Sequence, residues 1–343
     1  MDFGVTVLPD PPFSRWLELM KAAEAHGFQY AWTYDSHVLW QESIPMLAVA
    51  ARETAKIKLG HFVTNPATRD PTVLASAYAT LHDLSDGRMA MGIGRGDSAV
   101  RMLNGSPVTL ATLRESIEVI RALANGEQAS YNGNLLQFPW SVGSELPMWV
   151  AAYGPKALAL TGEVADGFIL QLADPTITEW AIAAVRKAAA DAGRDPSSVT
   201  ICAAAPAYVT DGTPANLEHA RNQCRWFGGM VGNHVADIVN RYGADKSGVP
   251  KPLVDYISGR TGYDYNQHGK AGNTHTDFVP DDVIDRFCLI GPVETHVARL
   301  RELESLGVDQ FALYLQHDAK SETLAAYGDR VLPAVNIRKA AKA

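Results

Sequence analysis

The sequence predicts an α/β fold and, within that class, a TIM-like (β/α)8 barrel with insertions at its C-terminal mouth. Eight short apolar stretches alternate along the chain with stretches of helical periodicity. Such alternation is typical of parallel strands joined by helices, and eight units are the number that closes this kind of barrel. An open doubly wound sheet is the alternative. No interdomain linker or internal repeat divides residues 1–343, so we expect one domain.

The predicted strands are apolar runs that end at proline, glycine or polar residues. The first run, Phe3–Leu8, ends at Pro9, and the second run, Phe28–Tyr34, ends at Asp35. The six remaining predicted strands are Ile57–Val63, Met89–Ile93, Met148–Ala152, Gly167–Leu172, Val199–Val209 and Gln310–Leu315.

Helical periodicity fills the intervals between these strands. Proline opens Pro71–Leu84 at its first turn, and Gly307 ends the amphipathic stretch Pro292–Leu306. Thr112 and Glu115 have the spacing of a capping box, which requires that their helix begin two residues later than its apolar pattern indicates. The predicted helices are Phe13–His26, Pro45–Thr54, Pro71–Leu84, Leu110–Leu123, Pro155–Val164, Ile177–Ala192, Pro214–Phe227 and Pro292–Leu306.

Two segments interrupt the alternation. Residues 127–146 contain Asn132-Gly133-Asn134, which favours a hairpin or a loop insertion. Residues 228–280 are rich in glycine, contain several prolines and show little periodicity. Because this second segment is too long for a simple connector, we expect a functional excursion over the barrel mouth.

Composition limits the classes of partner. Apolar residues make up 47% and charged residues 20% of the chain, as in a globular protein with a substantial core. A net charge of −8 argues against nucleic acid or an anionic membrane as a partner. The sequence shows neither a membrane-spanning run nor a signal peptide. The cysteines are odd in number and far apart, which disfavours a disulfide framework or a zinc site and fits a reducing cytoplasm: Cys202, Cys224 and Cys288.

Glycine-rich turns follow two of the predicted strands. After Met89–Ile93 the chain reads Gly94-Arg95-Gly96-Asp97, where glycine lets a ligand approach the backbone. After Met148–Ala152, Gly154-Pro155-Lys156 begins a helix whose first N–H groups favour an anion. The two turns predict a phosphate site, with ordinary tight turns as the alternative. A Rossmann fingerprint is disfavoured, because Asp97 occupies the place of its last glycine.

Titratable side chains lie at other strand ends. Asp35 and His37 are candidates for acid–base or cofactor-contacting groups, whereas the alternative is a helix cap for Asp35 and a surface position for His37. His61 lies within a predicted strand and is interpreted as an interior histidine. His268 and His275 flank a loop that favours phosphate or substrate over a metal. The chain has neither a GxSxG nor an HExxH motif, which argues against hydrolases of those types.

Three motifs carry a family resemblance. They are VTNPATRDP at Val63–Pro71, LSDGRMAMGIGRGD at Leu84–Asp97 and AAYGPKALALTGEVADGFI at Ala151–Ile169. With these motifs the chain resembles the bacterial luciferase-like superfamily and, within it, the methylenetetrahydromethanopterin reductase-like branch of F420-dependent oxidoreductases. The resemblance covers residues 3 to about 170 and returns at residues 290–315.

The resemblance implies a flavin-type cofactor in the mouth of the barrel. It implies a non-prolyl cis peptide within His61–Thr64, behind the cofactor ring. The residues that it implies next to the ring are Asp35, Thr64 and Asn65. Those that it implies at the phosphate, with the adjoining Ala152 and Tyr153, are Gly94, Arg95, Gly96, Gly154, Pro155 and Lys156.

The identity of the cofactor depends on the residues after the second strand. Deazaflavin enzymes of this superfamily usually carry an Asp-His pair there, and its FMN monooxygenases often carry Glu-His-His. This chain reads Asp35-Ser36-His37, which is closer to the first pattern with a serine inserted. The resemblance therefore implies coenzyme F420, with FMN as the alternative.

The expected function is that of a cytoplasmic oxidoreductase that transfers hydride between coenzyme F420 and a small organic substrate, with Asp35 and His37 as catalytic candidates. One alternative is an FMN-dependent monooxygenase that uses O2 and receives reduced flavin from a separate flavin reductase. Another is a non-catalytic flavin-binding protein. We expect no metal, and we expect a homodimer or higher homo-oligomer that pairs through the alanine-rich helices Pro45–Thr54 and Pro71–Leu84.

Overall fold

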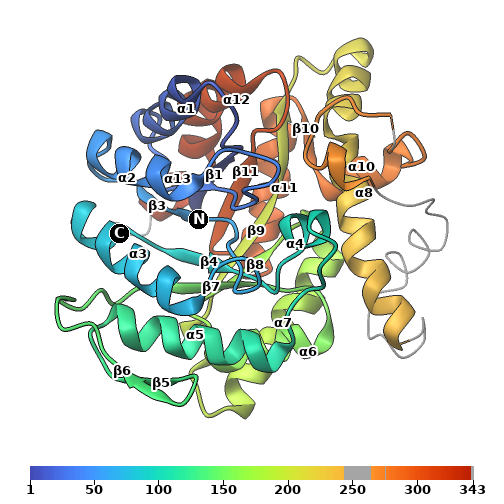
Figure 1. Cartoon of the computed structure of the whole chain (residues 1–343). Helices are drawn as coiled ribbons and strands as arrows, with labels where there is room; N and C mark the ends of the chain where they lie inside the picture. The colour runs from blue at the N-terminus through green and yellow to red at the C-terminus, as the bar shows by residue number, and fades with distance from the viewer. Residues whose placement is uncertain (243–263, 275, 341–343) are drawn as a thin grey trace.

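The computed structural model describes residues 1–242, 264–274 and 276–340, and its core is a parallel barrel (Figure 1). The strands follow the order β3-β2-β1-β11-β9-β8-β7-β4. Isolated parallel bridges, Leu59 to Met89 and Thr64 to Ile93, join β3 to β4 and close the ring. The barrel prediction is therefore confirmed. The barrel strands are β1 Asp2–Val7, β2 Tyr30–Thr33, β3 Lys58–His61, β4 Met91–Ile93, β7 Met148–Ala151, β8 Gly167–Leu170, β9 Thr200–Val209 and β11 Gln310–Tyr314.

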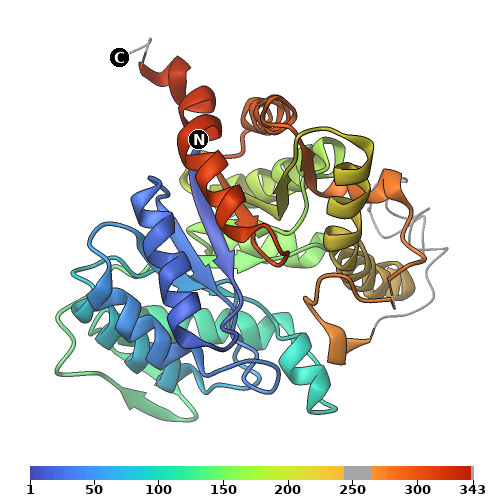
Figure 2. The ribbon, with the colours of Figure 1, turned by 90° about the horizontal axis from the view of Figure 1, so that it is seen from above.

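Helices surround the strands, as the view from above shows (Figure 2). The helices before α8 are α1 Phe13–Ala25, α2 Ser43–Glu53, α3 Pro71–Leu84, α4 Ser98–Met102, α5 Leu110–Ala124, α6 Pro155–Val164 and α7 Pro175–Asp191. Those from α8 onward are α8 Pro214–Tyr242, α10 Asp281–Phe287, α11 Val293–Ser305, α12 Lys320–Ala326 and α13 Leu332–Ala340. Short helical turns are η1 Pro196–Ser198, η2 Tyr265–Gln267 and the π-helical η3 Tyr327–Val331.

Helix α5 begins at Leu110 as predicted, so the condition for a capping box at Thr112 is not met. The side chain of Thr109 accepts a hydrogen bond from the Thr112 backbone nitrogen at 3.1 Å. Thr109 is therefore the N-cap residue, which satisfies one of the backbone N–H groups that a helix start leaves without a partner.

The expected hairpin is present in the first insertion. Strands β5 Ala129–Tyr131 and β6 Asn134–Leu136 pair antiparallel. Asn132 and Gly133 both have positive φ, 50° and 78°, as a tight two-residue hairpin turn requires. The hairpin lies beside α5, on the opposite side of the barrel from α8 and α10 (Figure 1).

The second insertion differs from the expectation. Helix α8 continues through Tyr242, whereas the sequence pattern placed its end at Phe227. Three glycines at 228, 229 and 232 lower helix propensity there, but Met230 and Val231 are buried. Burial of these side chains outweighs the intrinsic preference of glycine for non-helical backbone. The sequence analysis also missed β10 Leu289–Gly291, which pairs with Ala207–Val209 where β9 extends beyond the barrel.

Strands β3 and β4 approach closely because each has a glycine that faces the backbone of the other segment. A Cβ at Gly60 would lie 1.8 Å from the carbonyl oxygen of Ala90, and a Cβ at Gly92 would lie 2.4 Å from that of His61. The non-prolyl cis peptide expected in this region is found between Phe62 and Val63. Among the described residues, no helix combines the length and the apolar character that crossing a bilayer requires.

The closure predicts that Gly60→Ala destabilises the barrel. The added methyl group meets backbone rather than a movable side chain, so we expect a loss of about 3 kcal/mol or more in the free energy of unfolding. Urea denaturation followed by circular dichroism measures it, with Lys56→Ala at an exposed position just before β3 as the control. Equal midpoints for the two variants would contradict the role assigned to Gly60.

Candidate active site

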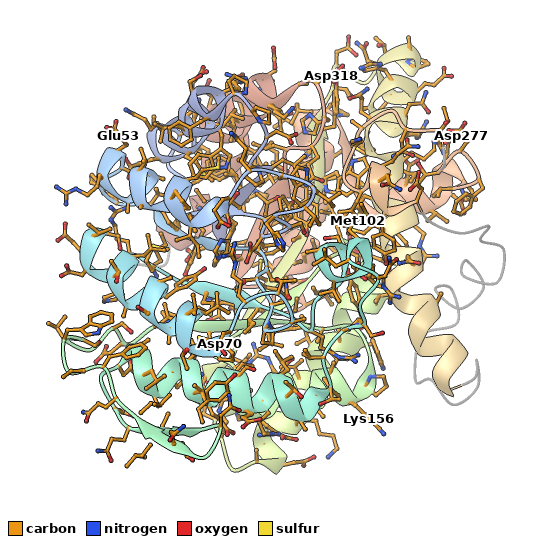
Figure 3. The ribbon with its side chains drawn as sticks, viewed as in Figure 1. Glu53, Asp70, Met102, Lys156, Asp277 and Asp318 are labelled. Carbon is orange, nitrogen blue, oxygen red and sulfur yellow. The ribbon has the colours of Figure 1, made fainter. Side chains whose placement is uncertain are left out.

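A cavity of about 720 Å³ lies at the carboxyl ends of the barrel strands. Residues that follow β2, β3, β4, β7 and β8 line it, together with residues of α4 and α8. Figure 3 labels Met102 on α4 and Lys156 on α6, two of the helices that contribute residues to the cavity. Most of the expected site residues line this one cavity: Asp35, Thr64, Asn65, Gly94, Arg95, Gly96, Ala152, Tyr153, Gly154 and Lys156.

The turn after β4 packs closely against Val100 and Asn65 at Gly96. Gly96 has a φ of 89°, and a Cβ there would lie 2.7 Å from a methyl group of Val100 and 3.1 Å from the Asn65 side-chain oxygen. That oxygen accepts hydrogen bonds from the backbone nitrogens of Ala67 and Thr68, at 3.1 and 3.0 Å. Asn65 thus fixes the turn after β3 against the turn after β4, and both face the cavity.

Helix α6 starts at the cavity in the way the sequence indicates. Gly154 is the N-cap residue and provides no side-chain hydrogen bond to the first turn. Pro155 occupies the first helical position and Lys156 follows it. Pro155 is exposed and does not itself line the cavity, which differs from its expected place at the phosphate.

Asp35 lies in the cavity wall and is tied to an arginine that the sequence analysis did not single out. The Nε and one terminal nitrogen of Arg69 donate hydrogen bonds to the two carboxylate oxygens of Asp35, each at 2.7 Å. The Thr64 hydroxyl donates a third hydrogen bond to Asp35 at 2.6 Å. The Asp35 side chain is only 1% exposed. Burial on its own raises the pKa of a carboxyl, but His61, Arg69 and Thr64 lower the pKa of Asp35 to about 2.

The environment of Asp35 therefore argues against proton donation at neutral pH, because the carboxyl is ionised and its oxygens accept several hydrogen bonds. His37, the second catalytic candidate, is exposed and does not line the cavity. The structure therefore does not support its expected place beside Asp35 in the site. The neighbouring Ser36 lines the cavity, and its hydroxyl oxygen lies 2.6 Å from the hydroxyl oxygen of Ser98.

His61 is an interior histidine, as expected. Its Nε2 lies 2.7 Å from the Ser43 hydroxyl and its Nδ1 lies 2.7 Å from the Tyr78 hydroxyl. Burial lowers the pKa of His61, so the ring is neutral near pH 7. Both ring nitrogens are thus satisfied inside the barrel.

Arg95 and His268 also line the cavity. The Arg95 Nε donates to the carbonyl oxygen of Val108 at 2.5 Å, which positions the side chain along the loop before α5. The His268 ring lies 6.0 Å from that of Trp40. His275 lies outside the described residues. Within the described part of the chain, no group of three or more His, Cys, Asp or Glu side chains is arranged to hold a metal ion.

Asp97 is the second carboxylate of the site, and its side chain is partly buried, with 28% exposed. One oxygen accepts hydrogen bonds from the Arg101 Nε and the Tyr265 hydroxyl, each at 2.9 Å, and the other lies 2.8 Å from the Nε2 of His234. Burial raises the pKa of a carboxyl, yet His234, with His268 and Arg101, holds the pKa of Asp97 well below its usual range. Asp97 thus joins the turn after β4 to α8.

Polar side chains in the wall of the cavity form a chain of hydrogen bonds. The Tyr153 hydroxyl donates to the Gln171 side-chain oxygen at 3.0 Å, and the Gln171 side-chain nitrogen donates to the Tyr314 hydroxyl at 2.5 Å. The Tyr314 ring in turn packs against Tyr34, with ring centroids 5.7 Å apart. Residues from the ends of β2, β7, β8 and β11 therefore hold one another in place.

The sequence analysis missed one whole wall of the cavity. Trp226, Met230 and His234 come from α8, in and just before the segment that showed no motif. The spacing of 226, 230 and 234 is that of one helical face, and this is the signal that would have identified them. Arg69 lies within the VTNPATRDP motif, and its type and distance from Asp35 gave no indication of pairing.

Comparison with known proteins agrees with this architecture. The sequence profile of a family described as luciferase-like monooxygenase matches residues 1–310. A 5,10-methylenetetrahydromethanopterin reductase of Methanolobus tindarius is 31% identical over 318 residues, which cover 90% of this chain and 93% of the relative. An F420-dependent glucose-6-phosphate dehydrogenase of Nakamurella multipartita is 25% identical, over 93% of this chain and 92% of the relative.

A solved structure shares the fold over nearly the whole chain. The coenzyme F420 dependent tetrahydromethanopterin reductase of Methanopyrus kandleri aligns with a TM-score of 0.76 at 25% identity, over 97% of this chain and 98% of that one. The fold and the site define a parallel barrel with a glycine-lined cavity at the carboxyl ends of its strands. The chain belongs to the luciferase-like monooxygenase family. The resemblance seen in the sequence motifs is therefore confirmed.

The ion pair predicts that Asp35 and Arg69 depend on each other for stability. Asp35→Asn removes the buried one of the two carboxylates that pair with Arg69, which keeps the exposed Glu42. Arg69→Gln leaves a buried carboxylate without its cation, so each single variant is expected to lose up to about 3 kcal/mol in the free energy of unfolding. The double variant is expected to lose clearly less than the sum of the two single losses. Urea denaturation of all three measures this coupling.

A surface pair provides the control. Arg114 and Glu163 are both 37% exposed, and Arg114→Gln is expected to lose no more than about 1 kcal/mol. Additive losses for Asp35→Asn and Arg69→Gln would contradict the assigned pairing.

Proposed function

We propose that this protein is an F420-dependent oxidoreductase that transfers hydride between coenzyme F420 and a small organic substrate. The observation that carries the proposal is the convergence of the turns after β4 and β7 on one cavity. Relatives and a solved structure whose names state F420 dependence support F420 over FMN.

The residues of the cavity fit a cofactor of this kind. Gly94, Gly96 and Gly154 present backbone that a phosphate can approach, and Arg95 and Lys156 lie at the same cavity. Among the described residues, the cavity wall also contains three buried polar atoms without a hydrogen-bond partner: Trp226 Nε1, His234 Nδ1 and Gln316 Oε1. Buried polar atoms are paired in most folded proteins. We infer that a bound molecule pairs with these atoms.

The deazaflavin supplies two-electron hydride chemistry when it is bound, and the chain supplies orientation and electrostatics. The turns after β4 and β7 bind the phosphate, and Thr64 and Asn65 form the wall where we expect the ring. Aromatic side chains exclude water from the opposite side, with Trp226 and Tyr314 stacked at 6.2 Å between ring centroids.

Equilibrium binding and turnover test the proposal. We expect the protein to bind F420 more tightly than FMN in fluorescence titrations, and to change the redox state of F420 when a suitable substrate is added. Tighter binding of FMN, with O2 consumption on addition of reduced flavin, would favour the monooxygenase alternative and a separate flavin reductase as partner. Binding without turnover with any reductant would favour the non-catalytic alternative.

The first prediction from the proposed function concerns Lys156. Lys156→Glu places a negative charge at the expected phosphate site, so we expect F420 binding to weaken by at least about tenfold at low ionic strength, or about 1.4 kcal/mol. Fluorescence titration measures the dissociation constant. Lys187→Glu is the control, because Lys187 is exposed on α7 and pairs with Asp191. Equal affinity in both variants would make the turn before α6 merely structural.

We also propose self-association through α2 and α3. Val49 on α2 and Val73 on α3 are 41% and 56% exposed, and apolar side chains on neighbouring helices favour pairing with a second copy. We expect a dimer or higher oligomer in sedimentation at micromolar concentration, and a monomer for Val73→Glu. Val142→Glu is the control, since Val142 is 86% exposed in the hairpin insertion. A monomeric parent protein would exclude the interface.

A cytoplasmic location is part of the same proposal. The cysteines at 202, 224 and 288 are free and buried, and free thiols persist in reducing compartments.

A further inference from the structure

The proposed reaction needs a group that exchanges a proton with the substrate. When hydride reaches a carbonyl carbon, the oxygen must gain a proton, and oxidation of an alcohol needs the reverse. The two candidates from the sequence are poorly suited to this task. Asp35 is ionised and held by Arg69, and His37 is exposed outside the cavity.

His234 on α8 has the geometry that the task requires. Its Nε2 lies 2.8 Å from one carboxylate oxygen of Asp97. The other oxygen of Asp97 accepts hydrogen bonds from Arg101 and Tyr265. Because the carboxylate is held from several sides, it fixes the orientation of the imidazole ring and keeps the hydrogen on Nε2.

The second ring nitrogen of His234 is left for another partner. Its Nδ1 is buried and has no hydrogen-bond partner among the described residues. The ring lines the cavity and lies 5.3 Å from the ring of Tyr153. With Nε2 bound to Asp97, Nδ1 accepts a hydrogen bond in the neutral ring and donates one in the protonated ring.

Other charged and titratable groups surround this pair. They are Arg101 from α4, Tyr153 from the turn after β7, Tyr265 from η2 and His268 from the segment that follows η2. Arg101 and Tyr265 are engaged with the carboxylate, so His234 is the member of the group that presents an unpaired titratable atom at the cavity.

Resting on the proposed function, we propose that His234, oriented by Asp97, exchanges a proton with the oxygen of a carbonyl or alcohol substrate. In reduction the carbonyl π bond breaks, the carbon gains a hydride, whose two electrons come from the reduced deazaflavin, and the oxygen takes the proton from Nδ1 of the protonated ring. The neutral imidazole regains its proton from water. Oxidation of the alcohol follows the same steps in reverse, with Nδ1 as the base.

The same helix contains a matched control. The Nε2 of His219 lies 2.7 Å from a carboxylate oxygen of Asp318. This pair is about half exposed, at 51% and 53%, and does not line the cavity. His234→Gln and His219→Gln therefore each remove an aspartate-bound imidazole from the same helix. The first lies in the cavity and the second lies outside it.

Turnover is the first measurement, with cyclohexanone and benzaldehyde as carbonyl probes and reduced F420 as the hydride donor. The His234→Gln amide still donates to Asp97 but does not titrate, so we expect a loss of about 10²-fold in kcat. F420 affinity should stay within about threefold, and His219→Gln should keep parental turnover. Added imidazole should restore part of the activity of His234→Ala, which a purely structural role would not allow. Parental kcat in His234→Gln would overturn the proposal.

The second measurement does not depend on turnover. Long-range proton–nitrogen NMR of protein with labelled histidine follows both ring nitrogens of His234, assigned by comparison with His234→Gln. Titration with cyclohexanone in the absence of F420 should shift the Nδ1 resonance of His234 and leave His219 unchanged. Failure of F420 binding with this shift present would count against the proposed function alone. No shift at saturating probe would overturn the role of His234.

Discussion

The close approach of β3 and β4 is the constraint on which the site depends. The two strands share isolated bridges in place of a continuous ladder, and their approach requires glycine at positions 60 and 92. Closure at this seam brings the turn after β3 beside the turn after β4. Asn65 and Gly96 then come within contact distance, and one cavity receives backbone from both turns. Within the motif Leu84–Asp97, Gly92 therefore permits closure of the barrel, while Gly94 and Gly96 line the cavity at its mouth.

Two carboxylates at this mouth, the buried Asp35 and the partly buried Asp97, have different partners, and the difference separates their roles. Asp35 is neutralised by Arg69, a guanidinium that retains its proton at any ordinary pH. Asp97 contacts His234, whose imidazole is the side chain that ordinarily exchanges protons near neutrality. An ionised carboxylate beside an arginine stabilises the wall of the cavity. An ionised carboxylate beside a histidine fixes the orientation of the imidazole ring, whose second nitrogen can still form a hydrogen bond with another group.

Local patterns in the sequence were sufficient for the barrel and for the turns after β4 and β7, because glycine, proline and apolar periodicity act within a few residues. Partners across the fold were not predictable in this way. The Asp35–Arg69 pair spans two loops, and the Asp97–His234 pair joins residues 137 positions apart. The end of helix α8 was predicted too early because the low helix propensity of Gly228 and Gly229 indicates a loop there. In the structure, the burial of Met230 and Val231 stabilises the helix through this point. The exposed position of His37 outside the cavity was not predictable, because a strand end does not determine where the following loop turns.

The two halves of the cavity come from different parts of the chain, and this division bears on specificity. The glycine turns and the Asn65 loop lie in the first half of the sequence, where the family motifs are found. The wall with unpaired polar atoms is formed by Trp226, His234 and Gln316. A hydrogen-bonding site rejects molecules that leave its buried groups unpaired. Two of those three residues, Trp226 and His234, project from α8, so a helix fixes their positions with more precision than a loop allows. If the proposed function holds, this wall of the cavity is where we expect selection of the substrate.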